Sequence, residues 1–251
     1  MKARIQNRLD DEVKTRLRKR IAEILLRESE AGNGDVHPVF HNLLQLLDDK
    51  ENCRLLLKAA DLYQKNHQYI KARQGYKNVL DDIKRINDDG VRELFTKAAI
   101  GYSTAIMVSG AFETQEVHGD ANVAVLALNE ARTKAEQSGD QNAQAIIELQ
   151  LATMKLLLGK HECAQSHFNR GLSMADGIQD PEIRQEVNTL STFFLFWQHR
   201  FLEIIANYEK FVSDEGKSEV EKYPENRSPL FMGAVLGRER GPIATSPWAV
   251  H

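Results

Sequence analysis

Residues 53–86 read CRLLLKAADLYQKNHQYIKARQGYKNVLDDIKRI, and this segment predicts two amphipathic helices joined by a short polar turn. Ala60 and Tyr63 share one face of the first helix, and Ala72 and Tyr76 share one face of the second. Alanines at a helix crossing let the helix axes come close, and tyrosines fill the groove beside them. We therefore predict that the two helices pack as an antiparallel pair.

The same pattern of small and aromatic residues returns further along the chain. The clearest copy places Ala164 and Phe168 where the first pair has Ala72 and Tyr76. The predicted pairs after the first lie at residues 91–139, 145–178 and 182–212, and residues 110–119 are predicted as a loop inserted in the second pair. Repeated helix pairs of this kind stack into a solenoid. The predicted fold is all-α, a right-handed superhelix of antiparallel helix pairs.

The pattern divides the chain into three segments. We expect an N-terminal helical pair or cap at residues 1–50 and the helical repeats at 51–212. Four of the six prolines fall in residues 213–251, where helical periodicity is lost. This last segment is predicted to be an irregular or disordered tail.

The N-terminal helix has an apolar stripe and a basic face. The stripe repeats every four residues, and the charged face is rich in arginine. The stripe consists of Ile5, Leu9, Val13, Leu17, Ile21 and Leu25, with Ile24 and Leu26 widening it. A helix that binds nucleic acid or a membrane surface could have this pattern. The favoured interpretation is a solvated basic face whose apolar side docks on the next helix.

Composition narrows the function classes. The net charge of −3 gives no reason to expect nucleic acid or an anionic membrane as partner. Two cysteines fit a reducing compartment, so we expect a cytoplasmic protein. No apolar run approaches the roughly 20 residues that span a bilayer.

The repeat pattern resembles two known families. Ala60, Tyr63, Ala72, Tyr76 and Val79 fall on signature positions of the tetratricopeptide repeat. The clean registers recur every 40 to 46 residues, roughly, compared with about 34 in that repeat. This longer period, after a basic helix and a His-containing helix, resembles the superhelical sensor region of MalT-type bacterial signal-transduction ATPases. The resemblance implies a sensor or scaffold segment that binds an inducer, a regulator or a second copy of itself.

No motif in the sequence predicts catalysis. A Gly-Lys-Ser run near the C-terminus lacks the earlier glycine of a phosphate-binding loop, because that position is Phe211. His37 with His41, and Cys163 with His167, have the i, i+4 spacing of metal ligands. No third ligand is evident near the first pair. The sequence HECAQSH around the second pair is not the H-E-x-x-H motif of zinc proteases, and Cys163 is expected to be a small buried residue. We predict no catalytic residue, no bound metal and no cofactor.

The predicted function is therefore non-catalytic binding of a protein or peptide, on the face formed by the first helices of the pairs. Self-association is a further expectation. The candidate binding residues on the outward side of these helices are Arg54, Lys58, Asp61, Gln64, Glu148, Met154 and Lys155. The alternative is a sensor that holds a small-molecule effector inside the superhelix, near residues 110–119 and 193–201.

Overall fold

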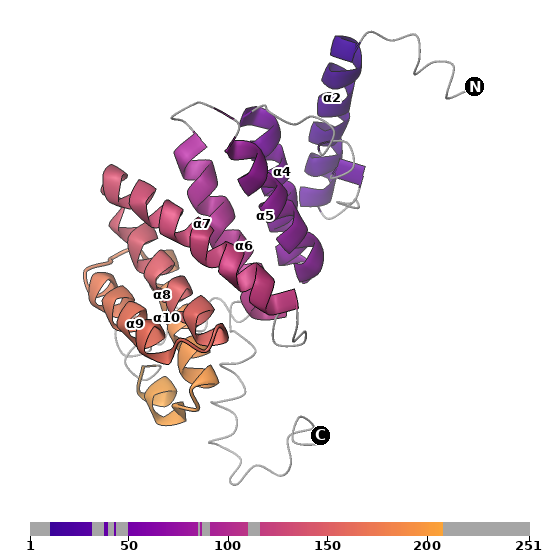
Figure 1. The fold of residues 1–251 in the computed structure, drawn as a ribbon. Helices are drawn as coiled ribbons and strands as arrows, with labels where there is room; N and C mark the ends of the chain where they lie inside the picture. The colour runs from indigo at the N-terminus through magenta and orange to yellow at the C-terminus, as the bar shows by residue number, and fades with distance from the viewer. Residues whose placement is uncertain are drawn as a thin grey trace, which may run out of the picture.

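The structure is a computed structural model that describes residues 11–31, 38–39, 43, 50–84, 86, 91–109 and 116–207. These residues form helices and connecting turns, with no strand among them (Figure 1). The helices are α2 (Asp11–Glu30), α4 (Lys50–Lys65), α5 (Tyr69–Ile83), α6 (Arg92–Ser109), α7 (Glu116–Ser138), α8 (Gln141–Leu157), α9 (His161–Ala175) and α10 (Pro181–Trp197). Residues 201–207 are also helical. The all-α prediction is confirmed.

The helices pack in chain order from α4 to α10, and alternate helices also meet. Each of these helices contacts the next one along the chain. In addition, α4 contacts α6, α6 contacts α8, and α8 contacts α10, so these four form a continuous row. Figure 1 shows α2 at one end of this array and residues 201–207 at the other. Consecutive helices that pack against their neighbours in this way are compatible with a helical repeat array.

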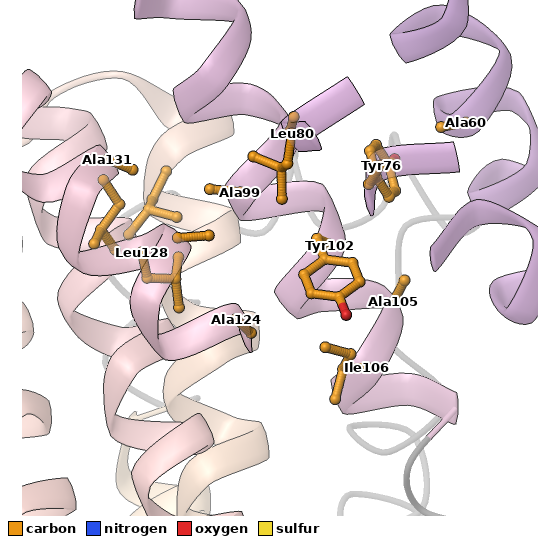
Figure 2. Packing of buried hydrophobic residues seen from close by; sticks show 14 of the residues in the cluster. Ala60, Tyr76, Leu80, Ala99, Tyr102, Ala105, Ile106, Ala124, Leu128 and Ala131 are labelled. Atoms are coloured by element: carbon orange, nitrogen blue, oxygen red, sulfur yellow. The ribbon is translucent and has the colours of Figure 1, made fainter. Parts of the chain in front are cut away.

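The core consists of the residues that the repeat pattern assigns to packing. Ala60, Ala72, Tyr76 and Tyr102 are buried, and the tyrosine rings lie between helices lined with alanine (Figure 2). In the second and third pairs Leu128, Ala164 and Phe168 are buried in the same way. The small–large alternation in the sequence thus marks real helix crossings.

Helix boundaries follow local signals in the sequence. Asp140 caps α8, accepting a hydrogen bond from the Ala143 amide at 3.0 Å. Asp180 does the same for α10, whose first residue is Pro181. Gly159 ends the turn between α8 and α9 with a φ of 71°, a conformation that glycine adopts without strain.

One boundary prediction is wrong. Residues 110–119 were expected to form a loop, but α7 begins at Glu116 and includes the last part of this segment. The second helix of the expected N-terminal pair lies mostly outside the described residues, because only 38–39 and 43 are described between 32 and 49. The predicted tail at 213–251 lies outside them entirely.

Helices α5 and α6 approach closely at Gly101. A Cβ atom at Gly101 would overlap the Tyr76 ring, which is 1% exposed. The ring therefore lies directly against the α6 backbone at this glycine. The repeat register did not single out this glycine, although its contact fixes the spacing of the first two pairs.

We predict that Gly101→Ala destabilises the protein. Glycine to alanine inside a helix normally gains about 0.5–1 kcal/mol. Here the added methyl group must displace the Tyr76 ring, so we expect a net loss of about 1–3 kcal/mol in the free energy of unfolding. Urea denaturation followed by circular dichroism measures this change.

The matched control is Gly119→Ala in α7, where nothing lies within 4 Å of the added Cβ atom. This variant is expected to be as stable as the parent or slightly more so. An equal increase in the free energy of unfolding for Gly101→Ala and Gly119→Ala would show that Tyr76 does not pack against Gly101.

Candidate functional site

Four of the predicted binding residues lie on α4 and are accessible to solvent. Arg54, Lys58 and Asp61 are exposed, and Gln64 is half-buried. Successive members of this set are three or four residues apart along the helix, so they share one face. The opposite face of α4 carries buried core residues, among them Ala60.

Helix α6 continues this surface with two further charged residues. Glu93 and Lys97 form an ion pair of 2.7 Å, one helical turn apart, and both are exposed. The pKa of Glu93 is lowered, first by the hydrogen bond from Lys97 and its charge, and also by the charge of Arg54 on α4. The charge of Lys97 in turn acts on Asp61 of α4. Helices α4 and α6 contact each other, so these exposed charged residues lie on neighbouring helices. Together with Lys58, which lies between Arg54 and Asp61 in sequence, we call Arg54, Asp61, Glu93 and Lys97 the α4–α6 face.

The carboxylate of Asp61 is oriented by a hydrogen bond from a buried tyrosine. The Tyr76 hydroxyl of α5 donates a hydrogen bond of 2.7 Å to Oδ1 of Asp61. Neighbouring protein atoms desolvate this carboxyl group and raise its pKa, although the residue as a whole is exposed. The same buried tyrosine therefore packs on Gly101 and orients a carboxylate of the α4–α6 face.

The outward placement of two predicted residues is wrong. Glu148 and Met154 on α8 are both fully buried. Helix α8 contacts α6, α7, α9 and α10, so most of its surface is covered by other helices. Lys155 is half-buried and does not join the α4–α6 face through any described contact.

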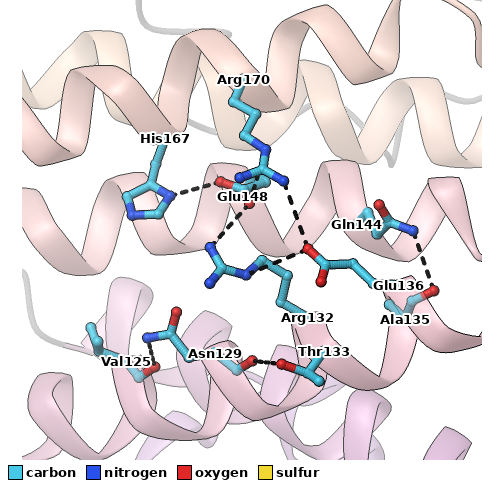
Figure 3. Close-up of polar contacts among 10 residues, drawn as sticks. All are labelled: Val125, Asn129, Arg132, Thr133, Ala135, Glu136, Gln144, Glu148, His167 and Arg170. Carbon is cyan, nitrogen blue, oxygen red and sulfur yellow. Dashed lines mark hydrogen bonds and ion pairs between the residues drawn. The ribbon is translucent and has the colours of Figure 1, made fainter.

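Glu148 instead lies at the centre of a charged cluster that joins α7, α8 and α9 (Figure 3). Its Oε2 lies 2.7 Å from Nδ1 of His167 on α9. Its Oε1 lies 3.5 Å from Nη1 of Arg132 on α7 and 3.5 Å from Nε of Arg170 on α9. Both arginines also approach Oε1 of Glu136, at 3.8 and 3.7 Å. We call these five residues the Glu148 cluster.

The cluster keeps a buried carboxyl group ionised. Burial alone would raise the pKa of Glu148, but the hydrogen bond with His167 and the charges of Arg170, His167 and Arg132 together lower it. An ionised carboxylate only accepts hydrogen bonds, so Nδ1 of His167 is the donor. The histidine of the Cys163–His167 pair is therefore engaged in a hydrogen bond with Glu148. Cys163 was expected to be a small buried residue, and this expectation is wrong because its side chain is exposed.

A second buried polar group ties α6 to α8. Gln150 is fully buried, and its Oε1 accepts a hydrogen bond from Ser103. Its Nε2 donates to Oγ1 of Thr104 at 2.9 Å. Because buried amide groups must be satisfied, these bonds fix one orientation of α8 against α6.

The described residues contain no group of three or more His, Cys, Asp or Glu side chains placed to hold a metal ion. Over the same part of the chain, every helix is too short or too polar to cross a membrane. The other candidate metal pair, His37 with His41, lies outside the described residues.

Comparison with known proteins gives no relative. No protein-family model matches the chain, and no curated protein matches it. The class that the fold defines is therefore an all-α array of consecutively packed helices, and the assignment to a particular family stays a resemblance.

Sequence reasoning missed the α6 half of the α4–α6 face. Glu93 and Lys97 have the i, i+4 order that stabilises a helix, and this is the signal that could have found them. The Glu148 cluster left no comparable signal, because Arg132, Glu148 and Arg170 come from three helices.

Proposed function

We propose that this protein is a non-catalytic interaction scaffold or sensor segment of a signalling system, and that the α4–α6 face binds a protein or peptide. In this proposal the helix pairs form a right-handed superhelix, and the row of α4, α6, α8 and α10 lines its concave side. The observation that carries the proposal is that two successive helices of this row contribute charged residues to a single surface.

The chemistry of the face suits a charged, extended segment. Both signs of charge occur on the face, and Asp61 is oriented by Tyr76 before any partner arrives. Mixed charge of this kind favours specificity and the rate of encounter more than affinity. A side chain that is already positioned loses less conformational entropy when it binds.

The alternative, a small-molecule effector inside the superhelix, was expected near residues 110–119 and 193–201. Phe194, in the second of these segments, is fully buried and stacks on Phe168 with ring centroids 4.3 Å apart. This ring is used for packing α9 against α10. The protein partner is therefore the function that we favour.

We predict that Lys58→Glu with Lys97→Glu weakens partner binding about tenfold, because two cations of the face become anions. The test is affinity purification from cells that express the protein, followed by cross-linking mass spectrometry to locate the partner contacts. Cross-links of the parent protein should fall on α4 and α6. Circular dichroism should show unchanged helix content, since both lysines are exposed.

The matched control is Lys84→Glu with Lys160→Glu, which makes the same charge change at two exposed residues outside α4 and α6. The control should retain the partner. Equal losses in both double variants would mean that net charge, and not the α4–α6 face, governs binding. Cross-links confined to other helices would refute the proposal directly.

A further inference from the structure

Helix α2 exposes large apolar side chains along one line. Leu17, Ile21 and Ile24 are 46%, 45% and 45% exposed. Their spacing of four and three residues places them on one side of the helix over two turns, a length of about 10 Å. The apolar side was expected to dock on the second helix of the N-terminal pair, which lies mostly outside the described residues. Of that apolar side Leu26 is buried, and α2 contacts α4.

Basic residues border this apolar stripe on both sides. At about 100° per residue, Arg16, Arg20 and Arg27 form a column next to Leu17 and Ile24. All three arginines are exposed, and Arg20 forms a 3.1 Å ion pair with Glu23. On the other side, Lys14 and Arg18 lie next to Ile21 in the same projection. The stretch from 14 to 20 contains five basic residues and no acidic one.

Helix α2 stands at the end of the array (Figure 1). A helix face of a solenoid that no neighbouring helix covers is normally polar. The exposed face of α2 carries Leu17, Ile21 and Ile24 instead. An apolar stripe of a and d spacing with charges beside it is the pattern of a helix that pairs with another helix.

We propose that the exposed stripe of α2 docks an acidic amphipathic helix of another protein. Apolar residues of the partner pack on Leu17, Ile21 and Ile24, and its flanking glutamates or aspartates meet the arginine column. Pairing with α2 of a second copy would bring arginine against arginine, which opposes association. The charge pattern therefore favours a partner of opposite sign.

The same pattern is less suited to an anionic membrane. Helix α2 contains no Trp, Tyr or Phe to sit at the lipid headgroups. Glu28 continues the line of the stripe one turn beyond Ile24, where a membrane-facing helix would place an apolar residue. A partner helix can meet this carboxylate with a basic or polar residue.

The test uses the full chain and a fluorescein-labelled synthetic helix of four heptads, with Ile at a, Leu at d and Glu at e and g. Fluorescence anisotropy should show saturable binding that weakens as salt increases. Leu17→Ser with Ile24→Ser, and separately Arg20→Glu with Arg27→Glu, should each raise the Kd about tenfold or more. These positions are exposed, so circular dichroism should show unchanged folding.

Controls separate the proposed docking from simple stickiness. Leu126→Ser removes an apolar side chain of α7 that is 72% exposed, and it should not change the Kd. A matched peptide with Lys at e and g should not bind. Equal binding of the acidic and basic peptides, or no binding of either, would overturn the proposal.

Two further measurements test the other occupants. In sedimentation velocity of the chain alone, the parent protein and the Leu17→Ser with Ile24→Ser variant should have the same oligomeric state. Flotation with phosphatidylserine–phosphatidylcholine vesicles should show no binding that these substitutions remove. A dimer that these substitutions abolish would assign the stripe to a second copy of the chain. Vesicle binding that they abolish would assign it to a membrane, and either observation would contradict the proposal.

Discussion

Replacing Ala72 with glutamate should unfold the α4–α5 pair and loosen the helices next to it. Ala72 is fully buried in α5, where the helix meets its neighbours. A carboxylate at this position would lose its hydration without gaining a partner, and we expect a loss of about 4 kcal/mol or more in the free energy of unfolding. Thermal melts followed by circular dichroism should show a lower or a broadened transition.

Ala164→Glu makes the equivalent change in α9, at a position that is also fully buried. In a repeat array each unit depends mainly on its neighbours, so damage should remain near the substitution. Hydrogen exchange measured by mass spectrometry should show faster exchange in α4, α5 and α6 for Ala72→Glu. For Ala164→Glu, the faster exchange should fall in α8, α9 and α10.

Two exposed residues provide controls with the same substituent. Gln74→Glu lies on α5 and Ser166→Glu on α9, and both side chains reach solvent. Each control should melt close to the parent. Unchanged melting of the buried variants would disprove the packing assignment, and uniform loss of protection along the whole chain would disprove the repeat behaviour.

The helix pairs could be predicted from the sequence because their packing residues repeat locally. Ala60, Ala72 and Tyr76 set a register that returns at Ala164 and Phe168, and all five are buried. The start of α7 could not be predicted in the same way. Its first residues, EVHGD at 116–120, show no regular apolar spacing in the sequence, so the pattern placed the helix start too late.

The surface was harder to predict than the core. On α4, which has neighbours on fewer sides, the residues outside the apolar stripe are the exposed ones. Helix α8 touches four other helices, so the same reasoning assigned Glu148 and Met154 to solvent although both are buried. The spacing of apolar residues along one helix does not indicate how many other helices will pack against it. That number depends on the arrangement of all the helices in the fold.

Glu148→Gln should destabilise the protein at neutral pH, because the cations of the Glu148 cluster lose the charge that they surround. Removing one member of a buried ion pair costs about 3–5 kcal/mol. Arg170 is 51% exposed and Arg132 27%, so water compensates part of this loss, and we expect about 2 kcal/mol. Urea denaturation at pH 7 measures the difference between the two proteins.

The difference should depend on pH in a defined direction. The pKa of Glu148 is lower in the folded protein than the ordinary value of about 4.3, so the folded state favours the ionised form. The stabilisation is then fully present above the unfolded pKa and is lost as the pH falls through the folded pKa. The gap in stability between the parent and Glu148→Gln should therefore narrow as the pH falls below about 4.5.

Gln144→Glu on the same helix is the control for a change of charge outside the cluster, since its amide bonds only to the Ala135 carbonyl. Its effect should be smaller than that of Glu148→Gln. A gap that stays constant down to pH 3 would mean that Glu148 is not ionised in the folded protein. In that case His167 and the two arginines would be held by Glu136 and by solvent, and the Glu148 cluster would not join α7, α8 and α9 through its buried charge.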